Sequence, residues 1–417
     1  MQLLDLLAWM APEPVPLDLF TAHADLLPAP LAGVAGDPVK FASSVGRLVE
    51  WFLVRRTAGE VTIAHRLLRQ SLRIHRTSAP LTEDPWSPTA VVQKLLVADL
   101  PGEIFSAPQN WPRWRALLPH VLAVHEDVRV DRANITSDSG WLLDRAAGYL
   151  LTHGRPAEAR PLYERASSLY EEAYGADHPE AATSLAGLGT VLAELGRPAE
   201  AKPLLESALS IYEAAYGSGP YVAAALGSLG RVLADLGRPA DAQPLYERAL
   251  EICEATYGPD DPEIATVLVG LGRALADLGR PAEAQPLYER ALAIDERAYG
   301  ADHPYVAGVL IGSGRVLAGL GRPAEAEPLL ERALAICEAV YGGDHPEVAS
   351  ALASLGRVLT DLGRSAAAKP MIERALSMYE AAYGPDHPEV GTGLARLGGV
   401  VSDLGNPPTP SRCSNAR

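Results

Sequence analysis

A sixteen-residue segment occurs twice in this chain with one difference. "DLGRPAEAQPLYERAL" runs from Asp277 to Leu292, and "DLGRPADAQPLYERAL" stands 42 residues earlier, from Asp235 to Leu250. A Gly-Arg pair, or a variant of it, marks each further copy of the pattern, at Gly154, Gly196, Gly237, Gly279, Gly321, Gly363 and Gly405. A fixed period of this length is typical of a solenoid, in which each repeat packs only on its neighbours.

Each repeat divides into two predicted helices. The first, for example Val306–Leu320, places apolar residues three and four positions apart, and Gly321 follows it as a helix stop. The second runs from about Pro323 to Tyr341, because proline suits the first turn of a helix. In the turn that follows, we expect Asp344 to cap the next helix and Glu347 to complete a capping box.

Small and large residues alternate where neighbouring helices must approach each other. The small ones are Gly272, Ala284 and Ala291 in one repeat and Gly314, Ala326 and Ala333 in the next, and Leu268, Leu271, Leu275 and Tyr288 fill the gaps between them. This pattern resembles tetratricopeptide repeats (TPRs) of the 42-residue type found in kinesin light chains. The resemblance implies an all-α superhelical solenoid over residues 138–405, with six repeats and a final helix. The segment 406–417 abandons the pattern and is predicted to be a disordered tail.

In this family the first helices line a concave groove that binds a protein or peptide. The groove positions implied here are Arg231, Asp235, Val269, Arg273, Asp277, Ile311, Arg315, Arg357 and Asp361. Arginine and aspartate four residues apart share a helix face, so they form either ion pairs on a wet surface or a charge ladder that holds an extended peptide. Gly319 replaces the acid that would accompany Arg315, which makes Arg315 the best candidate to bind an acidic group of a ligand.

One groove position departs from the kinesin light chains. An asparagine that can hold a peptide backbone recurs there in that family, whereas this sequence has Gly187, Ser228, Gly270, Gly312 and Ser354. We therefore expect this chain to have the groove of the family, but not the kinesin-like mode of cargo binding.

The histidines and cysteines do not predict a reactive centre. His178, His303, His345 and His387 stand one repeat or more apart, too far to converge on one ion, so we expect a role in the turns and no metal site. Cys253 and Cys337 are two repeats apart and cannot form a disulfide. We find no catalytic triad, paired carboxylates or phosphate-binding loop, and we expect no enzymatic activity and no cofactor.

The charge and hydropathy patterns limit the kinds of partner that this chain can bind. A net charge of −16 argues against bulk binding to nucleic acid or an anionic membrane. No apolar run reaches the length of a membrane span, and the N-terminus lacks the basic region of a signal peptide. We therefore expect a cytoplasmic protein whose partner is a protein or peptide.

The first 137 residues do not repeat. Residues 3–20 are predicted to form a helix, a turn and a helix, and residues 37–56 a helix that enters a strand. "TAGE" is a hairpin turn, "VTIAH" a returning strand, and "RLLRQSLRIHR" a further helix. Helices followed by a two-stranded wing predict a winged-helix-like domain at 1–80, with a helical connector at 81–137.

The order of these parts resembles the C-terminal half of STAND signalling ATPases of the NB-ARC type. In those relatives a histidine at the end of the wing contacts bound ADP, and His65 matches it, whereas Ala64 and Arg66 depart from the motif. The alternative is a structural histidine at a strand–helix junction. With no phosphate-binding loop and Met1 at the start of a helix, we expect a truncated or split member that lacks its ATPase domain.

The expected function is a non-enzymatic interaction scaffold in a STAND-type signalling system. One alternative is a regulatory fragment that acts in trans on a nucleotide-binding ATPase. Another is a winged-helix transcription regulator, because arginines gather around the wing, although they could equally contact an ATPase domain: Arg55, Arg56, Arg66, Arg69, Arg73 and Arg76.

Overall fold

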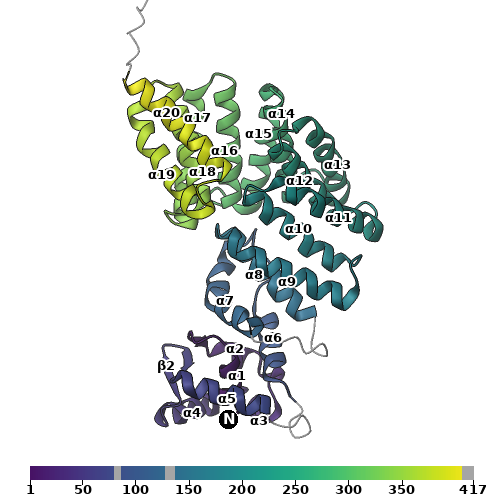
Figure 1. Cartoon of the computed structure of the whole chain (residues 1–417), viewed down its shortest axis with the longest axis vertical. Coiled ribbons are helices and arrows are strands. Elements are labelled where there is room, and N and C mark those ends of the chain that lie inside the picture. The colour runs from purple at the N-terminus through teal and green to yellow at the C-terminus, as the bar shows by residue number, and fades with distance from the viewer. Residues whose placement is uncertain (79–85, 127–136, 406–417) are drawn as a thin grey trace, which may run out of the picture. The chain divides into compact units, whose positions relative to one another are not determined.

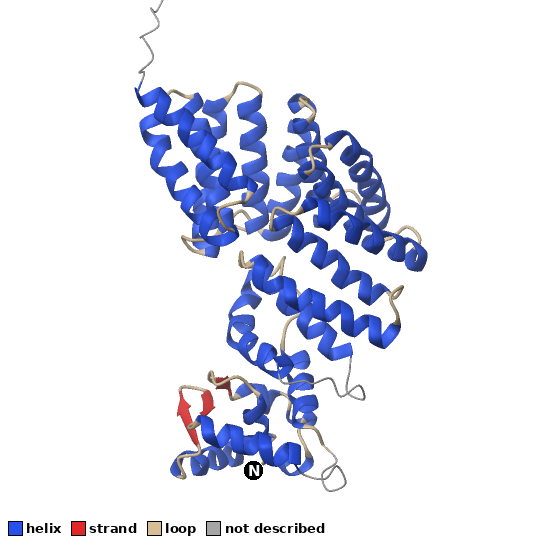
Figure 2. Cartoon of the chain, viewed as in Figure 1, coloured by secondary structure: helices blue, strands red, loops and turns tan. Residues whose placement is uncertain are grey.

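The computed structural model describes residues 1–78, 86–126 and 137–405, so the predicted tail at 406–417 lies outside the described residues. The chain is mostly helical and divides into two compact units (Figures 1 and 2). Unit 1 comprises Met1–Thr152 with Pro161–Ser184, and unit 2 comprises His153–Arg160 with Leu185–Arg417. None of the described helices is both long and apolar enough to cross a membrane.

Unit 1 combines short helices with a small sheet. Its helices are α1 (Gln2–Trp9), α2 (Asp18–Ala22), α3 (Ala29–Ala35), α4 (Pro38–Glu50), α5 (Arg66–Ser78), α6 (Pro88–Asp99), α7 (Trp111–Glu126) and α8 (Ser137–Thr152), with 3₁₀ turns at Ala24–Leu26 and Pro108–Asn110. Its strands are β1 (Val15–Pro16), β2 (Val54–Thr57) and β3 (Glu60–Ile63). Most of α9 (Pro156–Tyr174) also belongs to this unit.

The sheet confirms the predicted hairpin and adds a strand. β2 and β3 pair antiparallel, and Gly59 supplies the positive φ of 82° that their tight turn needs. β1 pairs with the other side of β3, which gives the order β1-β3-β2. The all-α class therefore does not describe this region, where the hairpin was predicted and the third strand, β1, was not. The prolines around Val15 favour an extended backbone, which allows Val15 to pair with Val61.

Two of the wing arginines hold the end of α1. Arg69 donates from Nε to the carbonyl oxygen of Ala8 (3.0 Å) and from Nη2 to that of Met10. Arg73 donates from Nε to the same Ala8 oxygen (2.6 Å), and its guanidinium lies 5.1 Å from the centre of the Trp9 ring. Cations at the C-terminus of a helix satisfy carbonyls that lack helical partners. These two arginines therefore have a structural role.

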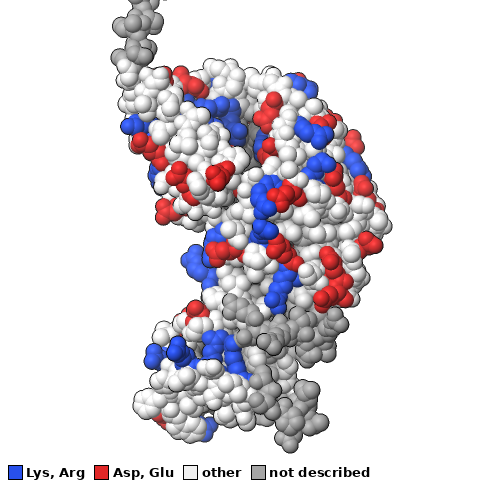
Figure 3. Space-filling view, in the orientation of Figure 1, with Lys and Arg blue, Asp and Glu red and all other residues white. Residues whose placement is uncertain are grey.

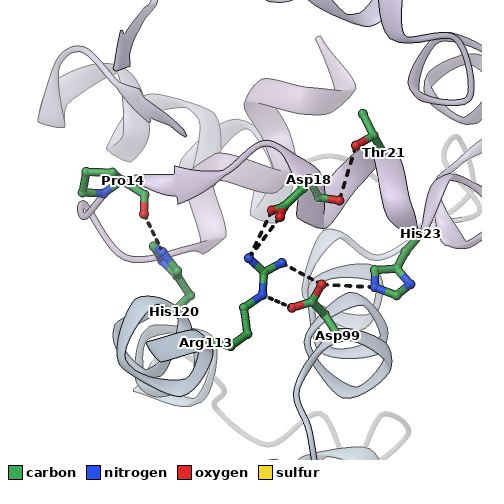
Figure 4. Close-up of polar contacts among 7 residues, drawn as sticks. All are labelled: Pro14, Asp18, Thr21, His23, Asp99, Arg113 and His120. Atoms are coloured by element: carbon green, nitrogen blue, oxygen red, sulfur yellow. Dashed lines mark hydrogen bonds and ion pairs between the residues drawn. The ribbon is translucent and has the colours of Figure 1, made fainter. Parts of the chain in front are cut away.

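Polar contacts join the predicted connector to the N-terminal residues within unit 1 (Figure 4). Arg113 of α7 donates from Nη2 to Asp99 at the end of α6 (2.7 Å) and from Nη1 to Asp18 of α2 (3.1 Å). His23 lies 3.2 Å from the same Asp99 carboxylate. A buried histidine, His120, accepts from the Ala11 N–H and donates to the Pro14 oxygen, which fixes the neutral ring with its proton on Nε2.

Unit 2 is a stack of antiparallel helix pairs (Figure 1). Its helices are α11 (Pro198–Tyr216), α12 (Pro220–Asp235), α13 (Pro239–Tyr257), α14 (Pro262–Asp277), α15 (Pro281–Tyr299), α16 (Pro304–Gly319), α17 (Pro323–Tyr341), α18 (Pro346–Asp361), α19 (Ser365–Tyr383) and α20 (Pro388–Gly405), together with the end of α10 (Pro179–Glu194). From α11 to α20, each helix packs on the next in the chain, as the repeat predicts.

The predicted glycine stops at the ends of the helices are confirmed, but the predicted N-cap of α18 is wrong. Gly321 has a φ of 73°, and the N–H of Arg322 reaches back to the Leu317 carbonyl (2.9 Å), as in a Schellman motif. At the start of α18 the cap is His345 and not Asp344. Its Nδ1 accepts from the Glu347 N–H (3.1 Å), while its ring stacks on Tyr341.

The same arrangement recurs at the other three turn histidines. Their Nδ1 atoms accept from the backbone N–H two residues later, and their rings stack on the tyrosine that ends the preceding helix: His178 on Tyr174, His303 on Tyr299 and His387 on Tyr383. The expected role in the turns is therefore confirmed. Within the described ranges, no cluster of side chains could hold a metal ion.

Candidate functional site: the groove of unit 2

A cavity of about 500 Å³ opens between the first helices of three consecutive repeats, α14, α16 and α18. Among the predicted groove residues, it is lined by Val269, Arg273, Asp277, Ile311, Arg315 and Arg357. Ile311 is buried and Val269 half-buried, so apolar side chains lie among the arginines. Tyr288 of α15 contributes to the wall, together with Glu347 and Ser350 of α18.

Two further cavities extend the groove within unit 2. One, of about 400 Å³, is lined by Arg231, Val269 and Arg273 together with Cys253 and Tyr257. The other, of about 450 Å³, is lined by Arg231, Asp235, Arg273 and Arg315. Glu194, Glu347, Glu389 and His387 line the same cavity. Asp361 is exposed near the end of α18 and lines none of these three cavities.

The arginines of the groove pair mainly with acids of the preceding repeat. Arg231 of α12 donates to Glu194 of α10 (2.9 Å), and Arg273 of α14 bonds Asp235 of α12. Arg273 also lies 3.8 Å from Asp277, the partner four residues later in its own helix. Figure 3 shows basic and acidic side chains close together over this unit. For Arg231 and Arg273, these contacts correspond to the first of our two interpretations, ion pairs on a wet surface, and not to a charge ladder that holds a peptide.

Arg315 breaks this series. Gly319 stands where an acid would follow it, and none of the described acidic side chains forms an ion pair with Arg315. Arg357 of α18 donates from Nη2 to the backbone oxygen of Arg315 (3.1 Å). Burial and the neighbouring charge of Arg315 lower the pKa of Arg357. Two cations thus lie close together in the cavity, and neither forms an ion pair with a described acidic side chain.

Glu347 faces the same cavities, which sequence reasoning did not anticipate. It was predicted as part of a helix cap, and only the coiling of the repeats brings it opposite the arginines. Desolvation by the surrounding protein, and then Glu194, raise its pKa to about 7, although water still reaches the side chain. The groove therefore has an acidic element as well as a basic one.

The two buried cysteines of unit 2, of which Cys253 lines a cavity of the groove, are not activated thiols. Cys253 and Cys337 are both buried and free. Burial raises the pKa of Cys253 to about 11 and that of Cys337 to about 12, so both thiols stay protonated near neutral pH.

His65 lies in the two-residue junction between β3 and α5, directly before α5. This is the strand–helix junction that the structural alternative for His65 assumes. It lines a small cavity of about 80 Å³ in unit 1, together with Leu7, Glu13, Thr62 and Arg66. Of the six wing arginines, Arg69 and Arg73 donate hydrogen bonds to a backbone oxygen of α1. The side chain of Arg76 lies outside the described part of the chain.

Several solved structures resemble this chain in fold. A Podosopora anserina putative kinesin light chain with nearly identical TPR-like repeats is 25% identical, over 49% of this chain and 97% of that chain, with a TM-score of 0.38. A Rap protein complexed with Competence and Sporulation Factor is 14% identical, over 81% and 92%, with a TM-score of 0.50. A STAND protein with a tetratricopeptide repeat sensor from Pyrococcus horikoshii is 15% identical, over 96% of this chain and 59% of that chain, with a TM-score of 0.46.

The curated proteins contain no match to this chain. The model of the tetratricopeptide repeat family matches residues 137–214, 221–297, 263–337 and 305–381, which together make up more than half of the chain. These matches cover the repeats whose helices form the groove. The chain therefore belongs to the tetratricopeptide repeat family.

Proposed function

We propose that this protein is a non-enzymatic scaffold that binds a peptide, or an extended segment of a protein, in the groove of unit 2. The observation that carries the proposal is the Arg315–Arg357 pair, in which neither guanidinium forms an ion pair with a described acid. The cavity that holds this pair is also lined by Ile311 and Val269. A carboxylate bound there would supply the missing charge, and an adjacent apolar side chain would contact Ile311.

The cavity sizes favour a peptide over a folded surface. The three cavities have volumes of about 500, 400 and 450 Å³ and share the lining residue Arg273. Each lies in the range of sites that enclose a small ligand, and together they form a path for several side chains of an extended segment. Because Arg231 and Arg273 are already paired, they contribute less to the affinity than Arg315.

The winged-helix-like module at residues 1–80 is the second part of the proposal. The β2–β3 hairpin followed by α5 supports it, as does the resemblance of the whole order to STAND proteins. We propose that this module connects the array to a signalling ATPase. The bonds of Arg69 and Arg73 to α1 disfavour the alternative of a DNA-binding surface on α5.

A selection from a display library of random peptides with free C-termini tests the groove. We expect peptides enriched by the wild-type chain to contain Asp or Glu, or to bind through the C-terminal carboxylate, beside an apolar residue. Arg315→Glu and Ile311→Asp should abolish the enrichment. Arg297→Glu is the matched control, because it makes the same charge change on an exposed arginine of α15 that lines none of the three cavities. Equal enrichment on all four proteins would place the binding site elsewhere.

A further inference from the structure

The repeats of unit 2 coil far enough for distant elements to touch. The turn between α10 and α11 meets the start of α20, where Nε2 of His387 donates to the carbonyl oxygen of Glu194 (3.0 Å). Nδ1 of the same ring accepts from the Glu389 N–H, so His387 caps α20 and contacts α10 at once. Both bonds together require a neutral ring with its proton on Nε2.

Two glycines show how close this approach is. A Cβ atom on Gly196 would lie 2.7 Å from Cδ of Pro388 and 3.0 Å from Cδ2 of His387. A Cβ atom on Gly154, in the turn before α9, would lie 2.5 Å from Cδ of Pro346 at the start of α18. The equivalent glycines Gly237, Gly279, Gly321 and Gly363 have the same positive φ and nothing within 4 Å of that position. The contact is therefore a property of two turns and not of the repeat.

The closing contact forms part of the ligand cavity. Glu194, Gly196, His387 and Pro388 line the cavity of about 450 Å³ that also contains Arg231, Arg273 and Arg315. Glu194 lies near Glu347 and raises its pKa, so like charges approach each other across this wall. Separation of α20 from the α10–α11 turn would remove one wall of the cavity.

We propose that the contact of the α10–α11 turn with the start of α20 is a latch that closes the groove and controls the entry of large ligands. The latch consists of Gly196 with Pro388 and of the Glu194 carbonyl with His387. Control of ligand entry rests on the function proposed above, whereas the closure itself does not.

Matched alanine substitutions test the closure without a ligand. Gly196→Ala adds a Cβ atom against Pro388, whereas Gly279→Ala adds one in open space. The two glycines have nearly equal φ angles, 70° at Gly196 and 74° at Gly279. The backbone strain is thus the same in both. Spin labels at the exposed positions Ala199 of α11 and Gly391 of α20 report the separation. We expect one narrow distance distribution in the wild type and in Gly279→Ala, and a longer, broader one in Gly196→Ala.

His387→Asn provides a second variant that keeps a capping side chain but loses the ring donor, and it should also broaden the distribution. His303→Asn, which makes the same change at an equivalent cap and ring stack that do not contact α10, should not. A broad distribution in the wild type would refute the closure. Equal distributions in Gly196→Ala and Gly279→Ala, or in the two histidine variants, would show that these residues do not hold the latch.

The reactivity of a cysteine inside the groove tests the control of entry. Ser350 lines two of the cavities, so Ser350→Cys can be labelled with a small methanethiosulfonate and with a maleimide on a long polyethylene glycol, with Cys413 replaced by Ser. We expect the large reagent to label the cysteine about tenfold faster, or more, in Gly196→Ala than in Gly279→Ala. The labelling rate of the small reagent should change far less. Equal acceleration of both reagents, or of neither, would contradict a latch. Failure of the peptide selection would leave both tests unaffected.

Discussion

At the scale of single residues, the groove-facing glycines are explained by the tyrosines of the preceding repeat. A Cβ atom on Gly312 would lie 2.2 Å from the ring of Tyr288, and one on Gly270 would lie 2.3 Å from that of Tyr246. Where the preceding repeat has leucine instead, at Leu205 and Leu330, the sequence has Ser228 and Ser354. In the sequence alone, these glycines and serines stood out only because kinesin light chains have asparagine at this position. The tyrosine or leucine that each of them faces belongs to the neighbouring repeat.

We predict that Gly312→Ser destabilises unit 2 by about 1–3 kcal/mol through overpacking against Tyr288. The same change at Gly308, in the same helix with open space around it, should be neutral or slightly stabilising. Tyr288→Leu should rescue Gly312→Ser, because leucine and serine already occupy this pair of positions elsewhere. Urea unfolding followed by circular dichroism measures these effects. Additive losses in the double variant would contradict the steric explanation.

Acid should destabilise unit 1 through its buried histidines. His125 is 4% exposed, and burial lowers its pKa to about 4, against about 6.5 in an unfolded chain. Between these values the unfolded state binds the extra proton, so stability falls as the pH drops from 6.5 to 4, by about 3 kcal/mol. His125→Leu should lose this part of the pH dependence. All six tryptophans lie in unit 1, so their fluorescence during urea unfolding reports it. An unchanged pH profile would refute this assignment.

At the scale of elements, most helices and the hairpin follow from local sequence. The bounds of α17 agree with the predicted Pro323–Tyr341, because proline and glycine act within one turn. β1 was missed, since a strand of two residues has no periodicity and is defined only by its pairing with β3. The cap at His345 was assigned to Asp344 instead, because aspartate is the commoner capping residue.

We predict that His303→Ala costs about 1 kcal/mol of stability, since the Tyr305 N–H at the start of α16 loses its acceptor. His303→Asp should cost less, because Asp261 already caps α14 in the same way, accepting from the Glu263 N–H (3.0 Å). Thermal unfolding of both variants measures the difference. Equal losses would attribute the effect to the ring stack with Tyr299 instead of the cap.

At the scale of the whole molecule, the period predicted the solenoid but not the contacts across its groove. The sequence placed Arg231, Arg273 and Arg315 on equivalent helix faces, and it identified Gly319 as the missing acid. It could not show that Arg231 pairs with Glu194 of an earlier helix, or that Glu347 faces the groove. Those relations depend on the small rotation between repeats, which accumulates along the array and has no local sequence signal.

The central claim is that the unmatched charge at Arg315 makes the groove a site for an acidic ligand. Its most direct test is the calorimetric affinity of a library-selected peptide for the wild type, Arg315→Glu and Arg297→Glu. We predict that Arg315→Glu weakens binding at least about tenfold, or 1.4 kcal/mol, and that Arg297→Glu leaves it unchanged. Equal affinities for Arg315→Glu and the wild type would contradict the claim, whatever else the peptide contacts.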